Sequence, residues 1–217
     1  DRDVTGVQTC ALPILLAQAP TPEELKACNT GGGEDARIEA CARLVAPARK
    51  SDRATTISAL NNLCDAYRRK PDFPRAHDAC AQSIALDPAQ SRAYGARGLL
   101  HQSEKQLDKA LADLDLSIKN GVGKPDFAPA RYLDRALVLR DLGKSDDAFV
   151  ALDDFIKRYK GGANYASALN ERGQMQLAKR RLDEALSDFR AASAASPRWS
   201  TAHYNIGQTL ARSEEHT

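Results

Sequence analysis

The cysteines are the residues of this sequence whose type and spacing indicate possible chemistry. Four cysteines form two close pairs, Cys28 with Cys41 and Cys64 with Cys80, and a fifth, Cys10, stands apart near the start. A thiol can form a disulfide, bind zinc as a thiolate or act as a nucleophile. Two pairs fit disulfides in an oxidising compartment, although buried thiols in a cytoplasmic protein would give the same count.

The other side chains that could act chemically stand alone. A zinc site built from Cys64, His77 and Cys80 lacks a fourth ligand and a known spacing. The run NGVGK, which starts at Asn120, has glycines like a phosphate loop, but it lacks the Walker spacing and a preceding strand, so it predicts a long turn. No histidine has a nucleophile or carboxylate in a recognised arrangement. We therefore expect no catalytic residue, no cofactor, no metal ligand and no enzyme activity.

The composition argues against two classes of partner. The 31 basic and 29 acidic residues nearly balance, and they are scattered without long blocks of one sign. A nucleic-acid partner is therefore not expected. No apolar stretch reaches the roughly 18 residues that a membrane-spanning helix needs, so no membrane span is expected in this fragment.

Both ends of the chain are expected to be artefacts. The expected artefact covers residues 1–14 (DRDVTGVQTCALPI) and 212–217 (RSEEHT). TCALPI at residues 9–14 and RSEEHT can be encoded by one DNA sequence and its complement, which two unrelated protein ends should not share. Both strings also resemble translated sequencing-library adapter, so we exclude them from the fold. Residues 15–21 read as the remnant of a signal peptide or a linker. We expect a periplasmic or secreted protein, with the cytoplasm as the alternative.

The rest of the sequence has helical periodicity that comes in pairs. In residues 61–90, and again in 168–197, apolar residues recur at helical spacing, pass through a turn, and recur again up to a proline. Each half predicts an amphipathic helix of about 12–14 residues. Pro88 and Pro197 end the second helices, because proline disfavours helical backbone in the residue before it.

This pattern resembles the tetratricopeptide repeat family, whose unit of about 34 residues folds as a helix, a turn and a helix. The family places small residues where paired helices approach and bulky residues in the gap to the next pair. The matching residues are Leu60, Cys64, Phe73, Ala76, Cys80 and Pro88, then Tyr94, Gly98, Leu107, Ala110 and Leu114, then Tyr132, Ala136, Ala148 and Leu152, then Leu169, Gly173, Leu182, Ala185, Phe189 and Pro197, and finally His203 and Gly207.

The resemblance implies an all-α fold, a right-handed superhelical solenoid of antiparallel helix pairs, in which neighbouring units share a continuous core. The expected units are a degenerate N-terminal helical hairpin and connection at 22–56, repeats at 57–90, 91–128 (with an extended loop), 129–165 and 166–199, and the first helix of a truncated repeat at 200–211.

The elements bring the cysteines of each pair together. Cys28 and Cys41 fall on two short helices around the turn NTGGGED, and Cys64 and Cys80 are equally far from Asp72 in the turn of the first repeat. We expect a disulfide between Cys28 and Cys41, since a short hairpin has little core of its own. For Cys64 and Cys80, a disulfide and a pair of small buried side chains both remain open.

In this family the first helix of each unit lines a concave groove that binds peptides or partner helices. Carried over to this sequence, the groove residues are Asn61, Asp65, Arg68, Arg69, Arg92, Leu99, Gln102, Leu133, Leu137, Arg140, Asn170, Gln174, Leu177, Tyr204 and Gln208, with an apolar centre at Leu99, Leu133 and Leu137.

The resemblance therefore implies a non-enzymatic scaffold, of a bacterial and exported kind, that binds a protein or peptide partner in its groove. The clamp with which some family members grip a C-terminal carboxylate is absent, because Ala96, Ala130 and Asp134 occupy slots that need other polar or basic groups. Two alternatives stay open: a structural or assembly subunit of a larger complex, and the repeat arm of a truncated multidomain enzyme.

Overall fold

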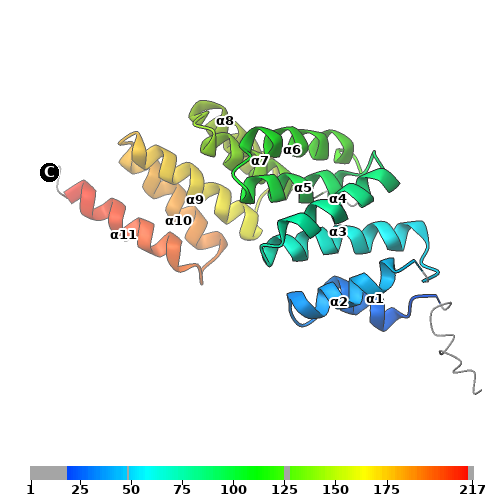
Figure 1. Cartoon of the computed structure of the whole chain (residues 1–217). Helices are drawn as coiled ribbons and strands as arrows, with labels where there is room; N and C mark the ends of the chain where they lie inside the picture. The colour runs from blue at the N-terminus through cyan, green and yellow to red at the C-terminus, as the bar shows by residue number, and fades with distance from the viewer. Residues whose placement is uncertain (1–18, 48, 125–127, 215–217) are drawn as a thin grey trace, which may run out of the picture. The chain divides into compact units, whose positions relative to one another are not determined.

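The computed structural model describes residues 19–47, 49–124 and 128–214, apart from the side chain of Glu214. All regular secondary structure in these ranges is helical (Figure 1). The helices are α1 (Pro22–Thr30), α2 (Glu34–Val45), α3 (Arg53–Arg69), α4 (Phe73–Leu86), α5 (Ser91–Ser103), α6 (Leu107–Gly121), α7 (Ala130–Asp141), α8 (Ser145–Arg158), α9 (Gly162–Ala178), α10 (Leu182–Ala195) and α11 (Ser200–Glu214). The predicted all-α array of helix pairs is confirmed.

Some helices exceed the predicted boundaries. α3 and α9 begin at Arg53 and Gly162, ahead of the repeat starts predicted at 57 and 166, and α11 continues past residue 211. Residues 1–14 and 215–217, predicted to be adapter, lie outside the described residues. In the described part of the chain no helix is both long and apolar enough to cross a membrane.

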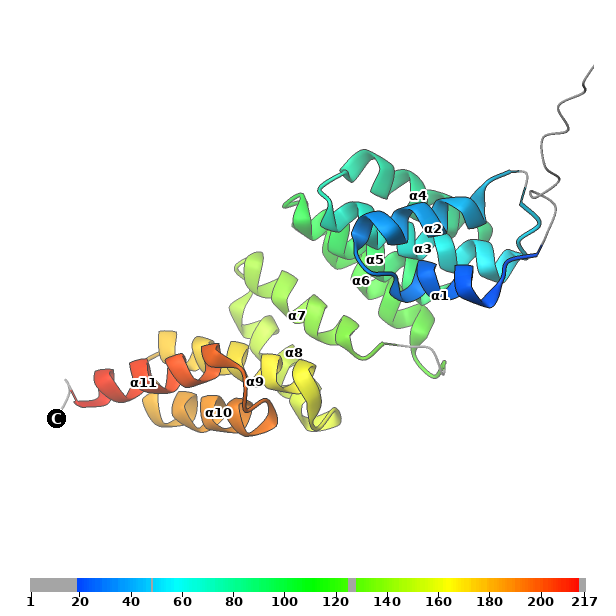
Figure 2. The same cartoon turned by 90° about the horizontal axis from the view of Figure 1, so that it is seen from below.

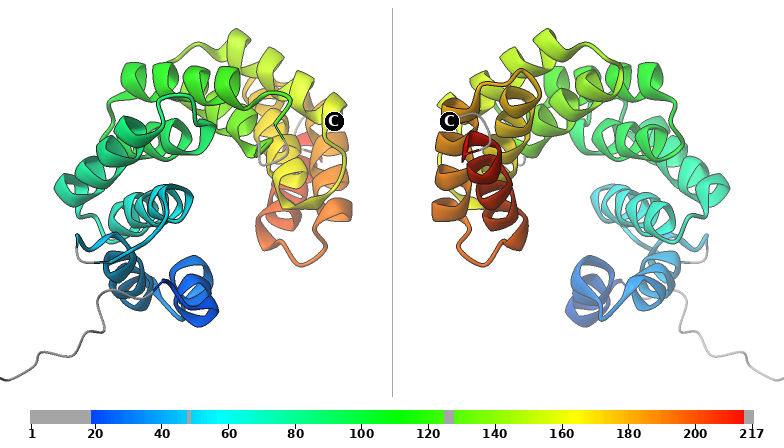
Figure 3. Two further views of the ribbon diagram at one scale, coloured as in Figure 1. Left: turned by 90° about the vertical axis from the view of Figure 1, so that its right-hand side faces the viewer. Right: turned by 90° about the vertical axis from the view of Figure 1, so that its left-hand side faces the viewer.

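The chain divides into two compact units, residues 1–88 and 89–217. The first unit contains α1–α4 and the second contains α5–α11. Within the second unit, α9, α10 and α11 lie side by side (Figure 2). A short turn joins α10 to α11 (Figure 3).

In the second unit the first helices of neighbouring pairs lie closer together than the second helices do. Each helix packs against the next one along the chain, and α5 also contacts α7, as α7 contacts α9. The second helices α6, α8 and α10 do not approach one another to this extent in the described residues. The layer therefore curves with α5, α7 and α9 on its inner side.

Small residues stand where paired helices cross. Ala110, Ala148 and Ala185, predicted to allow this approach, are fully buried. A Cβ atom on Gly173 of α9 would lie 2.7 Å from the Phe189 ring on α10, closer than carbon atoms pack. Glycine therefore sets the distance between these two helices.

Two helix pairs of the second unit are joined by the same ion pair. Arg97 on α5 donates to both carboxylate oxygens of Asp113 on α6, at 2.7 and 2.8 Å. Arg172 on α9 donates in the same way to Asp188 on α10, at 2.8 and 2.7 Å. Both aspartates are buried, and in each pair they follow the arginine by 16 residues. Two parallel bonds fix both the distance and the orientation of the helices.

The first unit contains two disulfides. Cys28 of α1 is bonded to Cys41 of α2, with Cα atoms 4.7 Å apart, and Cys64 of α3 is bonded to Cys80 of α4, with Cα atoms 5.3 Å apart. The second bond resolves the alternative left open by the sequence in favour of the disulfide. Both sulfurs of the zinc arrangement considered with His77 are thereby occupied.

Buried asparagines link first helices in both units. Asn62 of α3 donates to the side-chain oxygen of Asn29 on α1 at 2.8 Å, and Asn205 of α11 donates to that of Asn170 on α9 at 2.7 Å. α1 is thus bonded to α3 as α9 is bonded to α11.

Candidate protein-binding surface

The inner side of the second unit carries a cavity of about 440 Å³ between α7 and α9. It contains two of the predicted groove residues, Arg140 and Gln174. The complete lining is Arg140, Ser145, Glu171, Gln174, Met175, Ala178 and Lys179. Met175 and Ala178 give it an apolar part, and the remaining side chains give it a polar rim.

Arg140 is held in place by two carboxylates. Its guanidinium donates to Asp141 at 2.8 Å and forms an ion pair with Glu171 of α9. Burial by itself would lower the pKa of Arg140, but the bonds to Asp141 and the charge of Glu171 outweigh it and raise the pKa above its ordinary value. The rim therefore carries a fixed positive charge next to fixed negative charges.

Lys179 provides a second cation at the end of α9. Its ammonium group lies 2.9 Å from a carboxylate oxygen of Asp146 on α8 and 5.8 Å from the centre of the Phe149 ring. The hydrogen bond from Lys179 lowers the pKa of Asp146. Charges of both signs around an apolar floor suit a protein segment better than the uniformly negative backbone of a nucleic acid.

The structure buries three of the predicted groove residues. Leu133 is only 5% exposed and belongs to the core cluster that includes Leu169 of α9. Asn170 is 2% exposed beneath Asn205, and Asn61 is 3% exposed and accepts a bond from Ser83 at 2.8 Å. A neighbouring helix covers each of these positions, so none of them lines an open face.

The remaining predicted residues of the second unit are at least partly accessible. Leu99, Leu137 and Leu177 are half-buried, Arg92 and Gln174 are exposed, and Gln102 lies 3.4 Å from Asp141. On α11, Tyr204 is 63% exposed, and Gln208 donates to its hydroxyl at 2.6 Å.

The predicted residues of the first unit take part in an ion-pair network. Asp65 accepts from Arg68 at 2.8 Å and from Arg69 at 2.7 Å, and Arg69 also lies 3.1 Å from Glu34 of α2. These groups hold the N-terminal hairpin against α3. Each unit thus carries its own share of the predicted groove residues.

Sequence reasoning missed Glu171, Met175 and Lys179 in the cavity lining. Glu171 directly follows Asn170, and the family pattern selects Asn170 as the groove residue. The sequence does contain a signal. Glu171 on one first helix and Arg140 on the preceding first helix carry opposite charges, which could have suggested an ion pair between the two helices.

The paired helices, the buried small residues and the shared core define the class of helical-repeat proteins. More particularly, the family model of the tetratricopeptide repeat matches residues 133–198. The predicted family is thereby confirmed.

Several solved structures resemble the chain at low sequence identity, which supports the fold alone. Cut9–Hcn1, a hetero-tetramer of the APC/C, matches with a TM-score of 0.68 at 17% identity. The match covers 85% of this chain but only 34% of the chain in that structure. BtubC from P. vanneervenii matches with a TM-score of 0.68 at 16% identity, covering 90% of this chain and 85% of that one. YrrB, described as a tetratricopeptide protein with an unusual peptide-binding site, matches with a TM-score of 0.56 at 22% identity, covering 75% of this chain and 78% of that one. No curated protein matches the sequence.

Proposed function

We propose that the chain is a non-enzymatic scaffold that binds a segment of a partner protein on the inner side of its second unit. The tetratricopeptide fold is consistent with a protein-interaction scaffold. The observation that carries the proposal is the cavity between α7 and α9, which contains Arg140 and Gln174 from the predicted groove.

The chemistry of this cavity indicates the kind of segment that it binds. Met175 and Ala178 offer an apolar contact, while Arg140, Glu171 and Lys179 offer charges of both signs. A helix or extended peptide with one apolar side chain flanked by polar groups fits this arrangement. The ion pairs of the rim hold the site in one conformation before binding, which reduces the entropy cost of association.

The proposal can be tested with peptides selected from a displayed random library on the immobilised protein. The affinity of a selected peptide is then compared between the wild-type protein and the variants Arg140→Ala and Gln174→Trp. We expect each variant to weaken binding by about tenfold, or 1.4 kcal/mol. Arg190→Ala, an exposed arginine of α10, is the matched control and should leave the affinity unchanged.

Peptides that bind the Arg140 and Gln174 variants as tightly as the wild type would contradict this location. They would place peptide recognition elsewhere on the molecule and leave the fold assignment intact.

We also infer an oxidising compartment for this protein, because two disulfides in one small unit are typical of exported proteins. Trapping free thiols in the protein isolated from its native cell tests this. Free Cys28 and Cys41 would contradict export.

A further inference from the structure

The repeat between the two arginine–aspartate pairs of the second unit has no aspartate at the corresponding position. Arg135 of α7 stands at the place of Arg97 and Arg172 in their repeats, but 16 residues later the chain has Ala151 instead of aspartate. The structure thus contains two complete pairs and one arginine without its matching carboxylate.

Arg172 shows what a fully paired arginine of this array looks like. It donates to Asp188 of its own repeat and, at 2.8 Å, to Asp153 of the preceding second helix. Arg135 retains only the equivalent of the second contact, from its Nε to Asp115 of α6 at 2.5 Å. Among the described residues, no hydrogen bond or ion pair is made by its two terminal nitrogens. Its side chain is 34% exposed, against 17% for Arg172.

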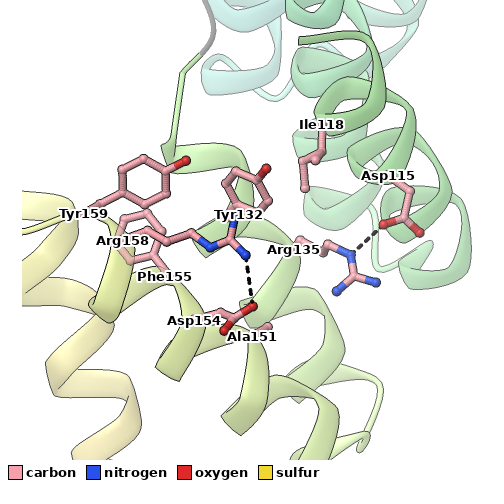
Figure 4. A pocket seen from close by; sticks show the side chains of 9 residues that line it. All are labelled: Asp115, Ile118, Tyr132, Arg135, Ala151, Asp154, Phe155, Arg158 and Tyr159. Carbon is pink, nitrogen blue, oxygen red and sulfur yellow. Dashed lines mark hydrogen bonds and ion pairs between the residues drawn. The ribbon is translucent and has the colours of Figure 1, made fainter. Parts of the chain in front are cut away.

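A pocket of about 320 Å³ lies at this position, lined from α6, α7 and α8 (Figure 4). Ala151 forms part of its wall, where a longer side chain would fill space. Three aromatic rings stand together in the lining, with the centroid of Tyr159 5.9 Å from that of Tyr132 and 5.1 Å from that of Phe155. These rings pack on the core, so the wall is well fixed.

A second guanidinium faces the same pocket. Arg158 of α8 lies 3.6 Å from Asp154, and both side chains are more than half exposed. That distance is beyond a hydrogen bond, and an exposed ion pair of this kind contributes little. The pocket therefore holds two guanidinium groups with most of their ten donor hydrogens available, beside two carboxylates.

We propose that this pocket binds a carboxylate side chain, aspartate or glutamate, from an acidic segment of a partner protein. The incoming carboxylate accepts two parallel hydrogen bonds from the two terminal nitrogens of Arg135, because its Nε already donates to Asp115. Arg158 adds a charge at the entrance, and the aromatic rings contact the methylene groups of the ligand. The site uses α6 and α8 on the outer side of the unit and is separate from the cavity between α7 and α9.

A carboxylate suits the pocket better than a phosphate because the group missing from the repeated pattern is itself a carboxylate. Its two coplanar oxygens match the planar fork of a guanidinium, as the two complete pairs demonstrate. The pocket volume suits one acidic side chain with the backbone beside it.

The test uses blocked hexaglutamate as the probe and blocked hexaglutamine as its uncharged control, titrated into the isotope-labelled full chain at about 150 mM salt. NMR follows the Nε–H resonance of Arg135. We expect hexaglutamate to shift this resonance with saturation in the millimolar range or below, and hexaglutamine to leave it unchanged.

The decisive variant is Ala151→Asp, which supplies the missing carboxylate from within the chain. It should fold with an unchanged or higher melting temperature, because the same pair already joins α5 to α6 and α9 to α10. Its affinity for hexaglutamate should fall by about tenfold or more. Arg135→Gln should show the same loss, whereas Arg190→Gln and Arg140→Ala should change the affinity less than about twofold.

Four results would overturn the proposal. Hexaglutamate could bind Ala151→Asp and Arg135→Gln as well as it binds the wild type, or it could fail to bind the wild type at millimolar concentration. Equal losses in Arg190→Gln would point to diffuse charge attraction, and tighter binding of inorganic phosphate than of acetate would make the pocket a phosphate site. Because Arg140→Ala serves as a control here, failure of this proposal and failure of the proposed inner-side function are distinguishable.

Discussion

At the scale of single residues, two glycines at equivalent positions should respond in opposite ways to alanine. Gly173→Ala would place a Cβ 2.7 Å from the Phe189 ring, so it should lower the free energy of unfolding by about 1–3 kcal/mol despite the better helix propensity of alanine. Gly207 of α11 has nothing within 4 Å of an added Cβ, and Gly207→Ala should raise that free energy by up to about 1 kcal/mol. Urea denaturation measures both. Equal effects would refute the close approach of α9 and α10.

The cap of α3 gives a prediction about pH. The backbone N–H of Thr55 donates to Asp52 at 2.7 Å and lowers the pKa of this carboxyl below 3.8. The ionised cap therefore stabilises the fold above that value, and its contribution is lost as the pH falls through the lowered folded pKa. Asp52→Asn keeps a capping side chain that does not titrate. Melting temperatures at about pH 7 and about pH 2.5 should show the wild type losing more stability on acidification than the variant. Parallel losses would contradict a charged cap.

At the scale of elements, the bond between Arg172 and Asp188 should fasten α9 to α10. Asp188→Ala leaves part of the largely buried guanidinium of Arg172 unpaired and should lower the free energy of unfolding by about 1.5–3 kcal/mol. Asp183→Ala, an exposed change in the first turn of the same helix, should cost less than about 1 kcal/mol. Chemical denaturation compares the two variants, and similar costs would mean that the bidentate pair adds nothing beyond a surface charge.

The elements were the part of the structure that the sequence revealed best. Ala110, Ala148 and Ala185 recur with the repeat period, so their role in helix approach could be predicted from the sequence. The burial of Leu133 and Asn170 could not be predicted, because the packing of the next helix pair decides whether their positions are covered. The pocket at Arg135 was missed for another reason: the absence of an aspartate has meaning only when the other repeats display the complete pair.

At the scale of the whole molecule, the disulfides should protect the first unit without affecting the far end of the second. Replacing Cys28 and Cys41 with serine removes a cross-link worth up to about 3 kcal/mol through the unfolded chain. In a repeat array each element depends mainly on its neighbours. Hydrogen exchange should therefore accelerate in α1 and α2 and stay unchanged in α9 to α11. Accelerated exchange throughout α9 to α11 would show that the two units unfold as one.

The same cross-links also determine how the protein would respond to mechanical force. If the chain is pulled from its two ends, the residues enclosed by each disulfide cannot extend, because the covalent bond carries the load past them. The bonds enclose sequence separations of 13 and 16 residues, which withhold about 45 Å and about 55 Å of contour length. Both disulfide-enclosed segments lie in the first unit. Under tension the first unit therefore extends by less than its number of residues would allow, and the second unit supplies most of the extension.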